Sequence, residues 1–320
     1  MVSYGVKSLK IFTGNSNRKL AQEISQYLNI PLGEADVSKF PDGETKVKIE
    51  ESVRGEDVFI IQSTCSPANE HLMELLIMID ALRRASAERI TAVIPYYGYA
   101  RQERKTRPRE PITAKLVANL LVSAGANRIL TMDLHAGQIQ GFFDIPVDQL
   151  EATTILVEYF KEKKLDNVVV VSPDVGGTAR ARGFAGRLNK PIAIIDKYRS
   201  TFDDVEIMHI VGKVEGKTAI MVDDIIDTAG SVTRGGQALL NAGAKEIYVC
   251  ATHPVFANAA KERLRKSFQE SLFKEVVVTN TIPLNNGDNL EGIKVLSVAE
   301  IFAQAIERIH NDLSVSELFK

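Results

Sequence analysis

Residues Ile220–Ser231 read IMVDDIIDTAGS, and this stretch decides the fold class of the chain. A continuously apolar run ends in two acids, turns through small residues and enters a helical stretch at Gly230–Asn241. Strands that are apolar without alternation are typical of parallel sheets covered by helices on both faces. The segment therefore predicts one strand–loop–helix unit of a parallel α/β sheet.

Outward from this unit, short β-branched runs alternate with amphipathic stretches almost from end to end. Strands are expected at Leu9–Phe12, Val58–Gln62, Ile90–Ile94, Ile129–Asp133, Val168–Ser172, Ile192–Asp196, Thr218–Asp223, Glu246–Ala251, Glu275–Thr279 and Ile293–Leu296. Helices are expected at Lys19–Leu28, Glu70–Arg84, Ile112–Ala124, Thr153–Lys163, Gly177–Leu188, Gly230–Asn241 and Val298–Ile309. This alternation predicts an α/β fold with doubly wound parallel sheets and right-handed crossovers.

The length of 320 residues suggests two domains of ~150 residues each. An internal similarity supports this division, because GANRILTMD and GAKEIYVCA each enter a strand after a helix-ending Gly-Ala, one in each half. We therefore expect an N-terminal α/β domain at residues 1–150 and a C-terminal α/β domain at residues 151–320.

Composition and charge exclude several classes of protein. Lys and Arg number 39 and Asp and Glu number 41, so no bulk positive charge is present to hold a nucleic acid. The densest apolar run, Leu72–Ile79, is far below the ~18 apolar residues of a membrane span. The two cysteines form neither a zinc pattern nor a disulfide framework. We expect a cytoplasmic protein with neither a membrane nor a nucleic-acid partner.

Acidic residues follow the expected strands, where ligands gather in open parallel sheets. Carboxylates crowded at one edge of a sheet repel one another unless cations or hydroxyl donors lie among them. Magnesium fits such an edge, since it binds through one or two carboxylates together with substrate phosphates. The residues concerned are Asp133 with His135, Asp174, Asp196 with Lys197, and the pair Asp223 and Asp224.

The loop that follows the paired acids is suited to an anion. Small residues at Asp227–Ser231 let backbone N–H groups converge, and a helix N-terminus adds about half a positive charge. Asp223 and Asp224 can accept hydrogen bonds from two adjacent hydroxyls. A phosphate beside a vicinal diol describes a ribose phosphate. The alternative is that Asp, Thr and Ser in this loop only cap the helix.

Beyond this chemistry, VDDIIDTAGS resembles the phosphoribosyl-diphosphate-binding signature of type I phosphoribosyltransferases and of ribose-phosphate diphosphokinases. Further segments, in collinear order to the closing SVSELFK, resemble the diphosphokinases alone. They are KFPDGETKVKIEESVRG at Lys39–Gly55, IPYYGYARQERKTRPREPITAKLVANLL at Ile94–Leu121, MDLHAGQIQGFFDIPVD at Met132–Asp148, VSPDVGG at Val171–Gly177 and AIIDKYR at Ala193–Arg199.

This resemblance implies an enzyme that transfers the diphosphoryl group of ATP to O1 of ribose 5-phosphate, releasing AMP. It implies domains of the type I phosphoribosyltransferase kind, Mg²⁺ as cofactor, activation by phosphate, inhibition by ADP, and a homo-oligomer, a hexamer in this class. One alternative is a type I phosphoribosyltransferase, which would explain the DTAGS loop but not FPDGE or ARQERK. The other is a non-catalytic regulatory subunit of a diphosphokinase complex.

For ribose 5-phosphate and catalysis, the resemblance implies roles for residues of the C-terminal half. Lys197 and Arg199 match the catalytic cations, at the start of an expected flap, Tyr198–Asp204. The family commonly has Arg where this chain has Tyr198, which puts a third cation there in doubt. Without the resemblance, these cations are ordinary surface residues. The implied ribose 5-phosphate residues are Arg199, Asp223, Asp224, Asp227, Thr228, Ala229, Gly230 and Ser231.

For ATP, the metal and regulation, the resemblance implies roles mostly in the N-terminal half. The adenine turn would come from a neighbouring subunit; without the resemblance, Phe40 is an ordinary core residue and Arg101–Arg109 a solvated basic loop. The implied ATP residues are Phe40, Asp42, Gly43, Glu44, Arg101, Gln102, Arg104 and His135. The implied metal positions are His135 and Asp174, and a phosphate and ADP pocket is implied near Arg83, Arg84, Ser314 and Ser316.

Overall fold

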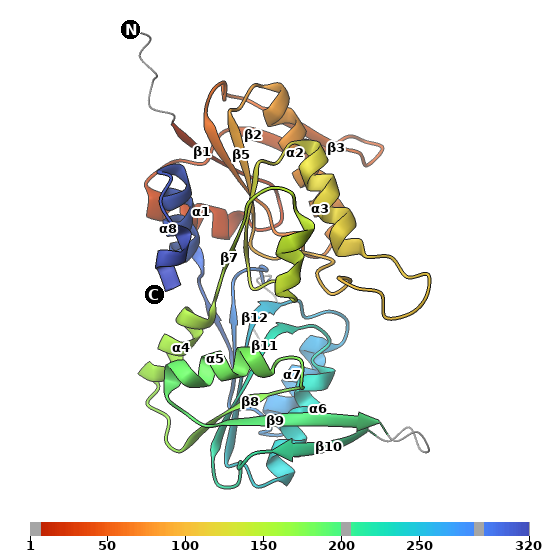
Figure 1. Ribbon diagram of the computed structural model, residues 1–320, viewed down its shortest axis with the longest axis vertical. Coiled ribbons are helices and arrows are strands. Elements are labelled where there is room, and N and C mark those ends of the chain that lie inside the picture. Colours follow the sequence, from red (N-terminus) through yellow and green to blue (C-terminus); the bar gives the residue numbers. More distant parts are fainter. Residues whose placement is uncertain (1–7, 200–205, 285–290, 320) are drawn as a thin grey trace. The chain divides into compact units, whose positions relative to one another are not determined.

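The computed structural model describes residues 8–199, 206–284 and 291–319 (Figure 1). The chain divides into two compact units, each of which is described by itself. Unit 1 comprises Met1–Glu151, Thr281–Pro283 and Ser297–Lys320. Unit 2 comprises Ala152–Asn280 and Leu284–Leu296.

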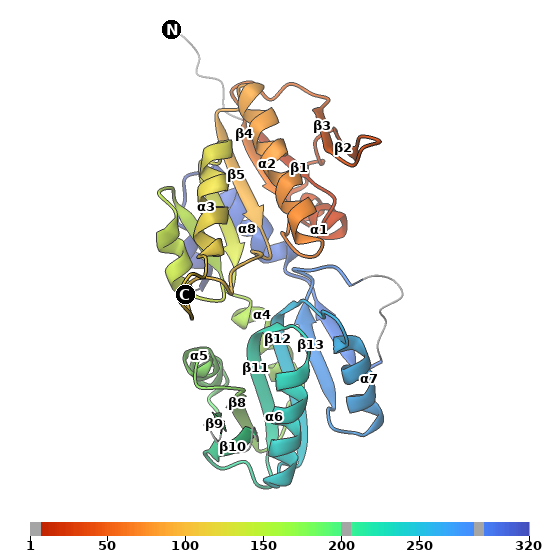
Figure 2. The ribbon, with the colours of Figure 1, turned by 90° about the vertical axis from the view of Figure 1, so that its right-hand side faces the viewer.

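Unit 1 is built on a five-stranded sheet in the order β1-β4-β5-β6-β7, in which every neighbouring pair is parallel. Its strands are β1 (Leu9–Thr13), β4 (Asp57–Ile61), β5 (Arg89–Ile94), β6 (Arg128–Met132) and β7 (Val147–Leu150). The helices of unit 1 are α1 (Arg18–Leu28), α2 (Ala68–Arg84), α3 (Thr113–Ala124), α8 (Ala299–His310) and the 3-10 segments η1 (Gly137–Phe142) and η2 (Val315–Phe319). Helices α2 and α3 cover one face, and α1 and α8 lie together on the other (Figure 2).

A separate antiparallel hairpin in unit 1 joins β2 (Ala35–Lys39) to β3 (Thr45–Ile49). Gly43 at its tip has φ 94°, a left-handed conformation that glycine adopts without strain. The Gly43 N–H donates to the Phe40 carbonyl over 2.9 Å and the Phe40 N–H to the Glu44 carbonyl over 2.8 Å. The PDGE sequence therefore forms a tight turn that projects at the end of two strands.

Unit 2 is built on a seven-stranded sheet in the order β10-β9-β8-β11-β12-β13-β14, parallel except for the β9–β10 pair. Its strands are β8 (Val168–Ser172), β9 (Ile192–Arg199), β10 (Glu206–Val211), β11 (Thr218–Ile226), β12 (Glu246–Pro254), β13 (Glu275–Thr279) and β14 (Ile293–Leu296). Its helices are α4 (Thr153–Glu162), α5 (Thr178–Leu188), α6 (Gly230–Asn241) and α7 (Ala260–Gln269). One face packs on α6 and α7; on the other, Phe160 of α4 packs edge-on against Phe184 of α5 and Tyr248 of β12.

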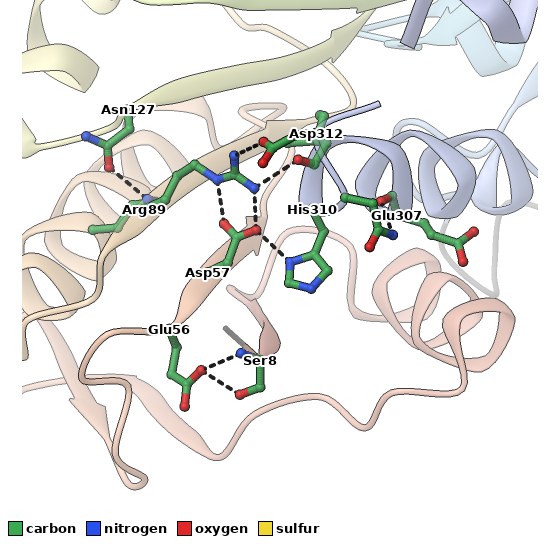
Figure 3. A network of polar contacts seen from close by, with 11 residues as sticks. Ser8, Glu56, Asp57, Arg89, Asn127, Glu307, His310 and Asp312 are labelled. Carbon is green, nitrogen blue, oxygen red and sulfur yellow. Dashed lines mark hydrogen bonds and ion pairs between the residues drawn. The ribbon is translucent and has the colours of Figure 1, made fainter. Parts of the chain in front are cut away.

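The C-terminal segment belongs to unit 1, which differs from a division into residues 1–150 and 151–320. Apolar residues of α8, among them Phe302 and Ile306, are fully buried. Beyond them, a polar network ties the end of the helix to the sheet (Figure 3). Arg89 donates to Asp57 over 2.8 and 2.5 Å and to the Ile309 carbonyl over 2.9 Å. Sequence order alone does not reveal such a return of the chain.

The predicted α/β class with doubly wound parallel sheets is confirmed, and every expected strand and helix is present in the described residues. The sequence analysis missed β2, β3, β7, β10 and α7. Strands β2, β3 and β7 are short and partly polar, and α7, AKERLRKSFQ, is mostly polar, with a narrow apolar face of Ala260, Leu264 and Phe268. Among the described residues, no helix combines the length and the apolar character that crossing a membrane requires.

Candidate functional site

The loop between β11 and α6 has the geometry of an anion cradle. Ala229, with φ 58°, turns the chain through a left-handed conformation into Gly230, the first residue of α6. The N-cap position is occupied by Ala229, whose side chain makes no capping hydrogen bond. The Thr228 carbonyl accepts from Nη1 of Arg263 on α7 over 2.8 Å. Because Arg263 already binds this carbonyl, the backbone N–H groups at the helix N-terminus stay available to an anion such as phosphate.

The paired acids Asp223 and Asp224 lie within β11, which continues to Ile226 instead of ending at Asp223 as expected. Oδ1 of Asp223 accepts from the Asp224 N–H over 2.8 Å. Nη1 of Arg180, on α5, lies 3.3 Å from Oδ1 of Asp223 and 3.1 Å from Oδ1 of Asp224. Burial, together with the hydrogen bond and charge of the neighbouring Asp224 carboxylate, raises the pKa of Asp223.

Asp174 lies at the carboxyl end of β8, in the turn that leads into α5. One of its carboxylate oxygens, Oδ1, accepts from the Gly177 N–H over 2.8 Å. Ser172 Oγ donates to the Asp174 carbonyl over 2.7 Å. These bonds fix the turn from both sides, while Oδ2 takes no hydrogen bond from any residue in the described part of the chain. Asp174 can therefore offer one oxygen to a cation or to a metal-bound water.

Lys197 and Arg199 lie on strand β9, which extends three residues beyond the expected end at Asp196. The backbone of β9 pairs antiparallel with β10, with Lys197 opposite Met208 and Arg199 opposite Glu206. Residues 200–205 of the expected flap, and the side chains of Lys197 and Arg199, lie outside what the structure describes.

The predicted adenine turn is the exposed tip of the β2–β3 hairpin in unit 1. The Phe40 side chain is 48% exposed, so its interpretation as an ordinary core residue is wrong. Asp42 is exposed, and its Oδ1 accepts from the Glu44 N–H over 3.1 Å. The turn thus exposes the aromatic ring of Phe40 and the carboxylates of Asp42 and Glu44 on the surface of unit 1.

The second segment predicted to bind ATP, Arg101–Arg104, lies in the loop between β5 and α3. Its start is fixed by Gly98, where an added Cβ would lie 2.3 Å from the Thr64 carbonyl oxygen. Gln102 is anchored, because its Oε1 accepts from Thr113 Oγ1 over 2.6 Å and its carbonyl from the Ala114 N–H over 3.2 Å. Arg101 and Arg104 are both exposed, and Nε of Arg104 lies 3.3 Å from Oε1 of Glu103.

His135 is exposed just beyond β6, three residues after the strand ends at Met132. Asp133 between them has φ 39° and donates its N–H to the Leu150 carbonyl over 3.0 Å. The left-handed turn at Asp133 directs the chain away from the sheet. His135 is therefore presented at the carboxyl edge of the unit 1 sheet, where the sequence analysis expects it.

The residues proposed for regulation lie in unit 1. Arg83 Nη1 donates to the Ser123 carbonyl over 3.4 Å, and Arg84 Nε pairs with Asp80 over 2.7 Å. Ser314 Oγ lies 2.8 Å from Ser316 Oγ in the segment after α8. None of these contacts joins the two arginines to the two serines, so the described geometry does not test a shared pocket.

The predicted site residues divide between the units. Unit 1 holds Phe40, Asp42, Gly43, Glu44, Arg101, Gln102, Arg104 and His135. Unit 2 holds Asp174, Lys197, Arg199, Asp223, Asp224 and Asp227–Ser231. Within unit 2, the acids and the phosphate loop belong to one strand and its following loop, so the structure brings these together. No sequence pattern identifies Arg180 or Arg263 as site residues, because a cation on a helix is typical of a solvated surface.

A resident metal would find few protein ligands here. The described residues contain no group of three or more His, Cys, Asp or Glu side chains that could hold an ion. Magnesium suits such a site, because it keeps several waters and binds through one or two carboxylates and substrate phosphates. Asp174, with one oxygen unused, fits this role better than His135, since neutral imidazole is a mediocre ligand for magnesium.

Comparison with known proteins gives concordant results. Two family models match, described as the N-terminal domain of ribose phosphate pyrophosphokinase at residues 9–125 and the phosphoribosyl synthetase-associated domain at residues 201–320. The chain is 60% identical over 319 residues to the ribose-phosphate pyrophosphokinase of Halalkalibacterium halodurans, covering 100% of each. It is 58% identical over 316 residues to that of Bacillus subtilis, covering 99% of this chain and 98% of the other.

Among solved structures, phosphoribosylpyrophosphate synthetase from Mycobacterium smegmatis is 44% identical, with a TM-score of 0.90. The match covers 96% of this chain and 100% of that one. Because the similarity extends over both units, it concerns the whole arrangement of sheets and loops described above.

Proposed function

Because the chain belongs to the ribose-phosphate pyrophosphokinase family, we propose that it transfers the diphosphoryl group of ATP to O1 of ribose 5-phosphate. The products are 5-phosphoribosyl 1-diphosphate, for nucleotide and amino-acid biosynthesis, and AMP. One observation of the site carries this proposal. Helix α6 begins at Gly230, a short loop after the paired acids Asp223 and Asp224, so one unit offers a phosphate cradle near acceptors for a diol.

The reaction forms one bond and breaks one bond at the β-phosphorus of ATP. The O1 oxygen of the sugar attacks that phosphorus, the bond to the α-phosphate oxygen breaks, and the O1 proton passes to solvent. Negative charge develops on the leaving α-phosphate oxygen and spreads over the transferred group. Catalysis of this kind consists of positioning and electrostatic stabilisation.

Unit 2 positions the sugar. The N–H groups at the start of α6 hold the 5-phosphate, and Thr228 and Ser231 contribute hydroxyls. Asp223 and Asp224 accept hydrogen bonds from the two ribose hydroxyls. Since β11 supports both acids and the loop, the distance between the phosphate and the diol is set by one rigid strand end.

Cations stabilise the transferred group. We assign this role to Lys197 and Arg199, whose backbone lies at the end of β9. A strand pair, β9 with β10, supports the two positions, and Arg199 also serves the ribose 5-phosphate. If the two cations contact the transferred group only after both substrates have bound, water is excluded from the reaction.

The nucleotide is assigned to the two exposed segments of unit 1. Phe40 stacks on the adenine, while Asp42 and Glu44 with Gly43 form the turn that recognises its edge. Arg101, Gln102 and Arg104 contact ATP, and His135 contacts a phosphate oxygen or a metal-bound water. Phosphate and ADP are the proposed effectors, at Arg83, Arg84, Ser314 and Ser316. The proposed assembly is a homohexamer in the cytoplasm.

Magnesium is the proposed cofactor. When bound, it neutralises phosphate oxygens and polarises the phosphoryl group. Asp174 in unit 2 and His135 in unit 1 are the two positions proposed for magnesium, each of which would be completed by phosphate oxygens and water. The residues of the chain then have three tasks: they hold the sugar, orient the nucleotide and keep cations at the leaving oxygen.

Product analysis tests the proposal. Purified protein with ATP, ribose 5-phosphate and magnesium should form AMP and 5-phosphoribosyl 1-diphosphate in equal amounts. Chromatography and ³¹P NMR measure both products. ADP with free phosphate would contradict it. Activity of this chain alone also separates an enzyme from a regulatory subunit. Consumption of the diphosphate with a free base would instead indicate a phosphoribosyltransferase.

A further inference from the structure

Arg180 connects the helix after one strand to the acids of the neighbouring strand. It is the third residue of α5, which follows β8, and β8 lies next to β11 in the sheet. Its Nη1 contacts both carboxylates, at 3.3 Å from Asp223 and 3.1 Å from Asp224. The Arg180 side chain is only 24% exposed, and that of Asp224 only 6%. A largely desolvated cation therefore lies between two adjacent acids.

The diol chemistry explains why a cation is required at this place. Two ribose hydroxyls donate hydrogen bonds, so both acids must act as acceptors, which ionised carboxylates do best. Two adjacent buried carboxylates disfavour each other's ionisation, and burial disfavours it further. Without a counter-charge, the pair would hold its proton to still higher pH and would offer the sugar a donor where an acceptor is needed.

We propose that Arg180 is a positioning residue for ribose 5-phosphate, which holds Asp223 and Asp224 as a fixed pair of acceptors for the sugar hydroxyls. This inference rests on the function proposed above and adds to it a residue that need not touch the substrate. One guanidinium nitrogen reaches both Oδ1 atoms, so a single side chain sets the orientation of both carboxyl groups.

The elements beside β11 bring three other titratable side chains near the acids. On β12, beside β11, burial and the Asp223 charge raise the pKa of the Cys250 thiol, which therefore stays neutral. His253, also on β12, is buried opposite Ile225 in the ladder. On the β8 side, Asp174 adds negative charge in the turn before α5. Arg180 contacts both Asp223 and Asp224, and its charge lowers the pKa of Asp223 against the other influences.

Removing the charge should weaken sugar binding in a pH-dependent way. In Arg180→Gln, the pair holds its proton to higher pH, so fewer molecules can accept both hydroxyls at low pH. Each unit by which the pKa rises lowers the ionised fraction about tenfold at pH below it. The ratio of KM for ribose 5-phosphate, variant over wild type, should be at least about tenfold larger at pH 6.5 than at pH 9.

The experiment compares full-length Arg180→Gln, Arg180→Lys and wild type by initial rates of AMP formation between pH 6.5 and 9. Taking the ratio to wild type cancels the titration of the substrate's own phosphate. Arg182→Gln is the matched control, because Arg182 is an exposed arginine two residues further along α5, and its ratio should stay near one. Arg180→Lys keeps the charge and should recover most of the loss at pH 6.5.

A second measurement does not depend on turnover. Titration calorimetry of ribose 5-phosphate in two buffers of different ionisation enthalpy counts the protons released on binding. Arg180→Gln should release more protons at pH 7.5 than wild type does. A KM ratio that does not change with pH, equal proton release, or a rise in KM for ATP alone would overturn the proposal. Wild-type AMP formation tests the proposed function separately, so the two failures are distinguishable.

Discussion

Nδ1 of His310 lies 2.8 Å from Oδ2 of Asp57, a carboxylate with no exposed surface, although 253 residues separate the two in sequence. Arg89 holds the same carboxylate through two hydrogen bonds and reaches Oδ1 of Asp312 over 3.2 Å (Figure 3). Because Asp57 begins β4 and His310 ends α8, this contact fixes the C-terminal helix to the sheet of unit 1.

Removing the Asp57 charge should therefore destabilise unit 1. Breaking one partner of a buried ion pair costs about 3–5 kcal/mol, so Asp57→Asn should lower the free energy of unfolding by that order. His310→Gln removes one hydrogen bond to a charged group and should cost about 1.5–3 kcal/mol. Urea denaturation followed by circular dichroism measures both. Asp80→Asn breaks the exposed pair with Arg84 and should cost less than about 1 kcal/mol; a similar loss in all three variants would refute this account.

Asp223 should reduce the stability of the fold in exchange for function. Its pKa is raised in the folded protein, so the ionised form is favoured by unfolding, and stability is lost as pH rises from the unfolded pKa towards the folded one. Asp223→Asn keeps an oxygen for the Asp224 N–H and should gain about 0.5–2 kcal/mol at pH 7.5, with no gain at pH 4. Thermal melting at the two pH values measures this. Ribose 5-phosphate binding should be lost in the same variant.

Lys197 should act mainly in the transition state. Removing a group that stabilises developing charge commonly lowers kcat about 10²–10³-fold, so Lys197→Ala should lower kcat far more than it raises either KM. Steady-state kinetics with both substrates measures this difference. Lys190→Ala removes an exposed lysine just before β9 and should leave kcat unchanged. Equal effects on kcat and on 1/KM would contradict a transition-state role.

Phe40 should contribute to nucleotide binding without contributing to the core. Stacking of a base on an aromatic ring is worth about 1–3 kcal/mol, so Phe40→Ala should raise KM for ATP about tenfold or more. Its exposed ring predicts a change in unfolding free energy within about 0.5 kcal/mol. Tyr27→Ala is the matched control, because Tyr27 is 59% exposed on α1. A large loss of stability in Phe40→Ala would show that the ring serves packing instead.

Asp174 should affect the magnesium requirement and leave the turn intact. In Asp174→Asn, the side-chain oxygen can still accept from the Gly177 N–H, so the melting temperature should stay close to that of wild type. Loss of the negative charge should raise the magnesium concentration needed for half-maximal activity. A magnesium titration of AMP formation measures it. An unchanged requirement would remove Asp174 from the proposed metal positions.

The sequence patterns that predicted the fold correctly are those in which one physical cause dominates. Strands such as VVVVS are apolar because both of their faces are covered, and that pattern is local. The hairpin strands β2 and β3 carry alternating polar residues, which loops also do. The placement of α8 in unit 1 depends on contacts between residues hundreds of positions apart, and no local pattern encodes them.

The site residues likewise divide into those that a local sequence pattern predicts and those that only the fold brings together. The loop Asp227–Ser231 and the two acids before it are contiguous, so their chemistry can be deduced from the sequence. Arg180 is separated from Asp223 by 43 residues, and only the adjacency of β8 and β11 brings them together. The sequence also does not predict that β9 continues to Arg199 and β11 to Ile226, because polar residues at the end of a strand are typical of a loop.

The return of α8 to unit 1 has a consequence for the order of events during protein synthesis. Strand β1 leaves the ribosome almost first, yet the helix that covers its sheet beside α1 is made among the last residues. Unit 2, encoded in the middle, has all its strands before α8 emerges. The nascent chain must therefore protect an uncovered apolar sheet until α8 has been made, and synthesis that stops before α8 leaves unit 1 without the helix that closes it.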